Sequence, residues 1–147
     1  MGAWKERGLR RLAAVAAHVV AERLERPTAP LTFVAPDPVR RRTRGDHPAE
    51  ALARALGERW ELPVEPTLTR RTGARQRGLS LADRRANVRG AFSAKAAPRH
   101  VVLVDDVYTS GATAGAAASA LRRAGAGRVD VVTFARVVRG YTVPPQA

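Results

Sequence analysis

The segment from Val101 to Thr113 limits what this chain can fold into more than any other stretch. It reads VVLVDDVYTSGAT, which is four branched apolar residues, two acids, and a run of mostly small and hydroxyl residues. A continuous Val and Leu run is typical of a parallel strand that is buried on both faces. The residues that follow are rich in alanine up to Ala124, and Gly125 is a natural end for a helix. We therefore predict a strand over 101–104, then a loop, then a helix over 111–124.

The remaining sequence alternates between helical and strand patterns. Apolar residues at helical spacing predict a helix from Leu9 to just before Pro27. A second helix is expected to begin near Asp46, an N-cap type of residue, with Pro48 in its first turn. Further strands are predicted over 31–35, 67–69 and 129–135, and a short helix over 80–88. This alternation predicts one α/β domain, residues 1–147, with a mainly parallel sheet flanked by helices.

The chain carries an unusual excess of arginine. It has 26 Lys and Arg against 13 Asp and Glu, a formal net charge of +13, and only Lys5 and Lys95 are lysines. Guanidinium groups form paired hydrogen bonds with phosphate oxygens. The composition therefore favours partners that carry phosphates, whether a nucleotide or a nucleic acid backbone, and does not choose among them.

Composition also excludes several classes of protein. The chain has no cysteine, which excludes disulfides and thiolate zinc sites, and its three histidines are scattered. No apolar run approaches the ~20 residues that a membrane span needs. Charged residues such as Lys5 and Arg7 interrupt the segment where a signal peptide would be apolar. We therefore expect a cytoplasmic protein without a membrane partner.

The two acids and the loop have the chemistry of a ribose phosphate site. At the carboxyl end of a parallel strand, Asp105 and Asp106 would emerge into the crevice where α/β sheets bind ligands. There they can accept hydrogen bonds from ribose hydroxyls and help to hold Mg²⁺ through water. Amides and hydroxyls at a helix N-terminus suit a monophosphate. The residues of that loop are Thr109, Ser110, Gly111, Ala112 and Thr113. The alternative is a purely structural role, in which the acids only cap the next helix. A binding site is favoured because all thirteen positions of the segment have the residue types, in the order, that such a site requires.

This segment resembles the phosphoribosyl diphosphate (PRPP) binding motif of type I phosphoribosyltransferases. More of the chain is similar to one branch, the ComF family of competence-associated phosphoribosyltransferase-like proteins. The similar stretches are 4–8 (WKERG), the Arg-rich segment ending at Arg44-Gly45, 76–80 (QRGLS) and 84–92 (RRANVRGAF). The resemblance covers roughly residues 4–139. It implies a type I phosphoribosyltransferase-like fold with a flap over the site.

The resemblance also implies roles for particular residues. Asp105 and Asp106 would face the ribose hydroxyls of PRPP together with Mg²⁺, and the 109–113 loop would hold the 5′-phosphate. The turn after the strand at 31–35 takes the place of the family's pyrophosphate loop. That turn includes Asp37, Pro38, Val39 and Arg40. The flap would span 70–85 and include Arg75, Gln76, Arg84 and Arg85. Such a flap would keep water from the reacting centre.

The chain departs from the family pattern in three places. Many ComF-like proteins carry an N-terminal cysteine zinc ribbon, whereas this chain has no cysteine and is interpreted as a shorter or truncated form. The family often has Gly-Phe-Asn-Gln where residues 45–48 read GDHP. Thr109 stands where purine-salvage relatives have a catalytic aspartate. A hypoxanthine- or guanine-type acceptor is therefore disfavoured, and no catalytic residue is assigned.

Two clusters of arginine lie outside the motif. They are Arg40, Arg41, Arg42 and Arg44, and Arg70, Arg71, Arg75, Arg77, Arg84, Arg85 and Arg89. Three interpretations are open: a solvated basic surface, a grip on pyrophosphate, or a weak, non-specific track for DNA. Neither cluster is interleaved with aromatic residues, so a base-stacking platform is not supported.

Two functions from different classes fit these features. The first is Mg²⁺-dependent transfer of the ribosyl 5-phosphate of PRPP to an unidentified nitrogen acceptor. The alternative is a non-catalytic protein that binds PRPP or a ribose 5-phosphate nucleotide and serves DNA uptake or competence. Both require the same ligand site, and the oligomeric state is left open.

Overall fold

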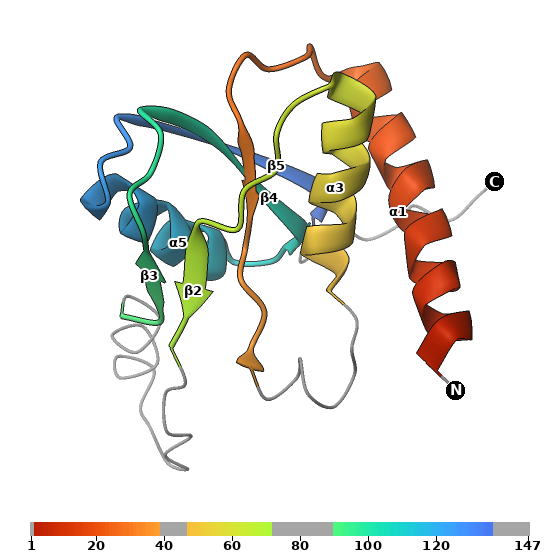
Figure 1. Cartoon of the computed structure of the whole chain (residues 1–147), viewed down its shortest axis with the longest axis horizontal. Coiled ribbons are helices and arrows are strands. Elements are labelled where there is room, and N and C mark those ends of the chain that lie inside the picture. The colour runs from red at the N-terminus through yellow and green to blue at the C-terminus, as the bar shows by residue number, and fades with distance from the viewer. Residues whose placement is uncertain (1, 39–46, 72–89, 137–147) are drawn as a thin grey trace, which may run out of the picture.

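A parallel sheet forms the centre of the protein. The computed structural model describes residues 2–38, 47–71 and 90–136 (Figure 1). The sheet contains β1 (Leu31–Phe33), β4 (His100–Tyr108) and β5 (Arg128–Arg136), in the order β1-β4-β5. Both pairings are parallel, with Phe33 opposite Val104 and Asp105 opposite Thr133. This confirms the predicted parallel α/β sheet.

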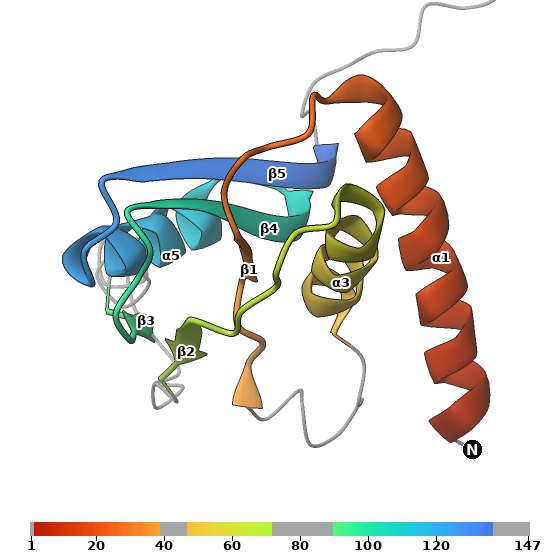
Figure 2. The ribbon, with the colours of Figure 1, turned by 45° about the horizontal axis from the view of Figure 1, so that its top comes forward.

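Alternating side chains of β4 divide the core into two halves. Val102 and Val104 pack on one face with α1 (Gly2–Arg23) and α3 (Pro48–Trp60). Val101 and Leu103 pack on the other face with α5 (Ala112–Arg123). All four β4 side chains are at most 1% exposed, as expected for a strand covered by helices on both sides. Figure 2 shows α1 and α3 on one side of the sheet and α5 on the other.

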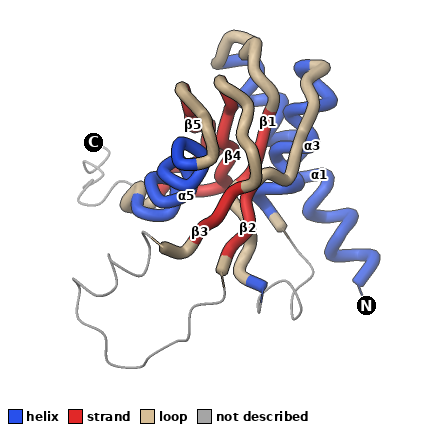
Figure 3. The backbone as a smooth tube through the Cα atoms, turned by 60° about the vertical axis from the view of Figure 1, so that its left-hand side comes forward, coloured by secondary structure: helices blue, strands red, loops and turns tan. Residues whose placement is uncertain are grey.

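A small antiparallel pair of strands lies beside α5. It consists of β2 (Leu68–Arg70) and β3 (Phe92–Ala94), with Thr69 opposite Ser93 (Figure 3). Leu68 and Phe92 are buried in the α5 half of the core. Beyond the strands, the Arg71 amide donates to the Ala91 carbonyl at 2.8 Å. The two ends of the 72–89 connection are therefore held together, while the predicted flap residues 72–85 and the predicted helix over 80–88 lie outside the described residues.

Several element boundaries differ from the sequence predictions. The first helix begins at Gly2 rather than near Leu9, since no proline interrupts it before Pro27. The second begins at Pro48 with His47, not Asp46, in the N-cap position, and His47 makes no side-chain capping bond. The central strand starts at His100 and continues to Tyr108, well past the predicted end at 104. The two acids therefore belong to the strand, because β5 stays paired with β4 along its whole length.

No helix in the described parts of the chain combines the length and the apolar character that crossing a membrane requires.

Candidate functional site

The carboxyl edge of the sheet brings the predicted ligand residues together. The Val34 amide, just after β1, donates to the Val104 carbonyl at 3.0 Å. Because β1 and β4 are parallel, the turn that contains Asp37 and Pro38 leaves the sheet at the same edge as Asp105. Both turn residues are half-buried. The other predicted pyrophosphate-loop residues, Val39 and Arg40, lie outside the described residues.

Asp105 is a buried carboxylate on the α5 side of the sheet. Neighbouring residues of a strand point to opposite faces, so Asp105 shares its face with Val101 and Leu103. Its side chain is 8% exposed, and its Oδ1 accepts a hydrogen bond from the Asp106 amide at 3.0 Å. Burial raises the pKa of Asp105 from its ordinary value of 3.8 to about 6, and the neighbouring Asp106 carboxylate adds to the rise. Asp106 is more exposed, and its carboxyl group lies close enough to that of Asp105 to interact with it.

The loop after β4 leads directly into the N-terminus of α5. Gly111 is the N-cap, with φ 73° and ψ −3°, a left-handed conformation that favours glycine. A Cβ on this residue would lie 2.1 Å from the Tyr108 hydroxyl oxygen, so any larger residue would have to displace the Tyr108 side chain. The Ser110 hydroxyl accepts from the Ala112 amide at 3.4 Å, and the first helical bond joins the Gly115 amide to the Gly111 carbonyl at 2.8 Å.

The first turn of α5 is suited to an anion. Its N-cap makes no side-chain capping bond and the turn contains no acidic residue. The leading amides of a helix have no partners within the helix, and the helix dipole places partial positive charge beside them. Thr109 and Ser110 are exposed, and Thr113 is half-buried at the same end of the helix. A phosphate group could therefore contact both amides and hydroxyls here.

The two acids and the loop lie close together along the chain. Asp106 precedes Thr109 by three positions along the chain. Two carboxylates, which can accept hydrogen bonds, are thus followed closely by helix N-terminal amides, which can donate them. Among the described residues, no group of three or more acidic or histidine side chains could enclose a metal. The carboxylate pair fits Mg²⁺ nevertheless, because this ion is commonly held by one or two carboxylates together with substrate phosphates and water.

Two neighbours of the site did not follow from sequence reasoning. Thr133 of β5 lies directly opposite Asp105, which places a hydroxyl residue beside the buried carboxylate. Tyr108 lies against the Gly111 backbone, where a larger residue would have to displace its side chain. The sequence did contain one indication of Thr133, because it is a polar residue within a mainly apolar strand. Its partner became evident only with the register of β4 and β5.

Most of the remaining predicted site residues fall in the segments 39–46 and 72–89, outside the described residues. The flap residues Arg75, Gln76, Arg84 and Arg85 lie outside the described residues. The same holds for both arginine clusters, with the exception of Arg70 and Arg71. The guanidinium carbon of Arg70 lies 5.4 Å from the centre of the Phe92 ring, a distance typical of a cation–π contact. The Arg70 side chain thus packs on the ring of its cross-strand neighbour at the end of the β2–β3 pair.

The chain is similar to known proteins in sequence and in fold. No protein-family model matches the chain. The chain is 35% identical to Competence protein F of Haemophilus influenzae over 100 residues, which is 63% of this chain and 44% of that protein. This similarity confirms the predicted relationship to ComF proteins. It spans less than half the length of that relative.

Solved structures show where the fold occurs. The allosteric regulatory enzyme of purine biosynthesis matches with a TM-score of 0.57 and 24% identity, over 83% of this chain and 25% of its own. The glutamine PRPP amidotransferase of B. subtilis matches with a TM-score of 0.56 and 24% identity, over 86% and 26%. The hypoxanthine phosphoribosyl transferase of Trypanosoma cruzi matches with a TM-score of 0.50 and 16% identity, over 97% and 71%. The chain is therefore ComF-like in sequence and has a phosphoribosyltransferase-like fold.

Proposed function

We propose that this chain binds PRPP or a ribose 5-phosphate nucleotide at the carboxyl end of β4. One observation carries the proposal. A buried carboxylate with a raised pKa, Asp105, stands next to Asp106 and shortly before the uncapped N-terminus of α5. A strand that needed only to fold would not bury an acid at this position, because burial of a charge is unfavourable without a partner. A ligand with hydroxyls or a cation provides that partner.

Different residues of the site are proposed to bind the ribose, the 5′-phosphate and the diphosphate of the ligand. Asp105 and Asp106 accept hydrogen bonds from the two ribose hydroxyls, which requires Asp105 to be ionised. The amides at the start of α5, with Thr109, Ser110 and Thr113, donate to the 5′-phosphate. Gly111 provides the left-handed backbone conformation in which the loop enters α5 at this end of the site. When bound, Mg²⁺ would neutralise the negative charge of the diphosphate, and the carboxylate pair would help to hold it.

We further propose that the bound PRPP transfers its ribosyl 5-phosphate to a nitrogen acceptor. The bond between C1 of the ribose and the diphosphate breaks, the nitrogen lone pair forms the new bond, and diphosphate leaves with the bonding electron pair. The acceptor nitrogen then loses its proton to water or to the diphosphate. The turn at Asp37 and Pro38, at the same edge of the sheet, is the proposed diphosphate side of the site. Arg75, Gln76, Arg84 and Arg85 belong to the proposed flap that excludes water. The fold of the transferases supports this step, and the similarity to ComF proteins supports the ligand site.

A non-catalytic role is the second candidate. The similarity to Competence protein F favours it, together with Thr109 at the position of the catalytic aspartate that the family resemblance implies. In that case the same site would bind PRPP or a nucleotide as a signal for an accessory function in DNA uptake. Turnover separates the two candidates, whereas binding alone does not.

Thermal unfolding with added PRPP, with and without Mg²⁺, tests the shared claim. A ligand at about 100 times its dissociation constant adds about 2.7 kcal/mol to the free energy of unfolding. We expect a rise in the unfolding temperature that needs both PRPP and Mg²⁺. Diphosphate release in the presence of ammonia or simple amines would then favour the transferase. An unfolding temperature that does not respond to PRPP, ribose 5-phosphate or a nucleoside monophosphate would refute the site.

A further inference from the structure

A basic surface lies at the amino-terminal ends of the sheet strands, opposite the candidate site. We call it the amino-edge surface. Its residues are Lys95, Arg99, Arg122, Arg123 and Arg128, and all five are exposed. They come from three separate parts of the chain: the connection before β4, the last turn of α5 and the start of β5. Figure 2 shows the connections before β4 and β5 next to each other, near the end of α5.

Backbone hydrogen bonds hold these segments together. The Ala97 amide donates to the Ala124 carbonyl at 2.9 Å, which joins the connection before β4 to the end of α5. The amides of Gly127 and Arg128 both donate to the Arg99 carbonyl, at 2.8 and 2.9 Å. The segments that carry these cations are therefore brought together by the fold and are not one continuous charge run in the sequence.

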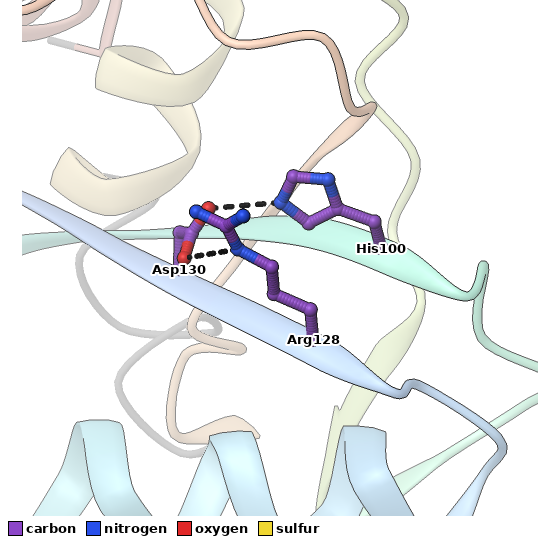
Figure 4. Close-up of polar contacts among 3 residues, drawn as sticks. All are labelled: His100, Arg128 and Asp130. Atoms are coloured by element: carbon purple, nitrogen blue, oxygen red, sulfur yellow. Dashed lines mark hydrogen bonds and ion pairs between the residues drawn. The ribbon is translucent and has the colours of Figure 1, made fainter.

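The surface has almost no compensating negative charge. Residues 95–99 read KAAPR and residues 122–128 read RRAGAGR, so neither segment contains an acid. The adjacent acid on β5, Asp130, is already engaged on both oxygens (Figure 4). Its Oδ1 accepts from Arg128 Nε at 3.0 Å, and its Oδ2 lies 2.8 Å from His100 Nε2. No carboxylate among the described residues forms an ion pair with Lys95, Arg99, Arg122 or Arg123.

The chemistry of the surface selects among anionic partners. Four of its five cations are arginines, whose forked donors match phosphate oxygens. The residues between them are alanine, glycine and proline, so the surface has neither an aromatic platform for bases nor large apolar side chains for insertion into a membrane. Small residues also let a long polyanion approach the backbone. We propose that the amino-edge surface binds the phosphate backbone of duplex nucleic acid without sequence preference.

This surface is separate from the candidate site. His100 and Asp106 are six residues apart on β4, which corresponds to about 20 Å at the rise of an extended strand. The two sites also use different residues throughout. A nucleic acid duplex and PRPP should therefore bind at the same time, and neither proposal depends on the other.

Fluorescence anisotropy with a labelled DNA duplex of mixed sequence tests the surface. Lys95, Arg99, Arg122 and Arg123, if each contacts one phosphate, predict a fall in affinity on the order of a hundredfold between about 50 and about 200 mM salt. In the Arg122→Gln, Arg123→Gln double variant, the slope of log affinity against log salt should become shallower by about 2. The matched control is Arg10→Gln with Arg11→Gln, which removes two adjacent exposed arginines from α1 instead. Saturating PRPP should leave the affinity for the duplex unchanged.

Each other outcome counts against the amino-edge surface. An equal loss of slope in the control would mean that binding is spread over the whole basic chain. Competition by PRPP would assign the duplex to the candidate site. Binding to anionic vesicles in place of the duplex would identify a membrane surface as the partner. Urea unfolding of both double variants, compared with the wild-type chain, shows whether they remain folded and keeps the comparison valid.

Discussion

Replacement of Asp105 by Asn should make the protein more stable at neutral pH. The pKa of Asp105 is raised from 3.8 to about 6 in the folded protein, mainly by burial. The folded state therefore holds this proton more tightly than the unfolded state does. The carboxyl contributes stability below its ordinary pKa, and that stability is lost as the pH rises through about 6. Above this range the folded state contains a buried charge that the variant lacks.

The size of the effect follows from the two pKa values. A displacement from 3.8 to about 6 corresponds to about 3 kcal/mol between the two protonation states. Asn retains an Oδ1 that can accept from the Asp106 amide, so the hydrogen bond at 3.0 Å need not be lost. We therefore expect Asp105→Asn to raise the free energy of unfolding by about 1–3 kcal/mol near neutral pH. The gain should shrink steadily below about pH 6 and vanish near 3.8.

Urea unfolding at several pH values measures this difference. The control is Glu58→Gln, which removes one negative charge from an exposed position on α3. In a chain with a net charge of +13, loss of an acid should by itself be slightly unfavourable, because it increases repulsion among the cations. An Asp105→Asn variant that is no more stable than the wild-type chain at neutral pH would refute the reasoning, as would a gain that does not depend on pH.

Three further outcomes are expected. Affinity for PRPP with Mg²⁺ should rise about tenfold between about pH 5 and about pH 7, because the ligand needs ionised Asp105. Calorimetry that shows no such rise would contradict the role of Asp105 as a hydrogen-bond acceptor for the ribose. Gly111→Ala should lower the free energy of unfolding by about 1–3 kcal/mol and weaken PRPP binding, because φ is 73° and the added Cβ would lie 2.1 Å from the Tyr108 hydroxyl. Urea unfolding measures the loss, and the control is Gly115→Ala, whose added Cβ meets no atom within 4 Å. Trypsin should cleave at Arg75, Arg84 or Arg85 more slowly when PRPP is present, and an unchanged rate would count against a flap.

Local patterns in the sequence were sufficient to predict the central strand, the loop after it and the helix that follows. The Val101–Val104 run predicted a strand with both faces covered, and its side chains alternate between the two halves of the core. Gly125 marked the end of the helix after the loop, which the structure ends at Arg123. The 109–113 loop was placed correctly at the start of that helix because glycine and hydroxyl residues have local conformational preferences.

Features that depend on distant pairing were not evident in the sequence. The continuation of β4 through Asp105 and Asp106 depends on β5, which pairs with it residue by residue. The same pairing brings Thr133 next to Asp105. The β3 strand of three residues is too short for a periodic signal and exists because β2 pairs with it. The amino-edge surface was missed for a similar reason, since hydrogen bonds between loops gather arginines that lie far apart in the chain.

Isothermal calorimetry of PRPP with Mg²⁺ tests the central claim most directly. The wild-type chain is compared with Asp105→Asn, Asp106→Asn and with a control, Glu58→Gln, Glu65→Gln, which removes two exposed acids outside the candidate site. We predict saturable binding by the wild-type chain and the control, and none by the Asp105→Asn, Asp106→Asn variant, which urea unfolding should show to be folded. Equal affinity for PRPP in all three proteins would contradict the assignment of this site.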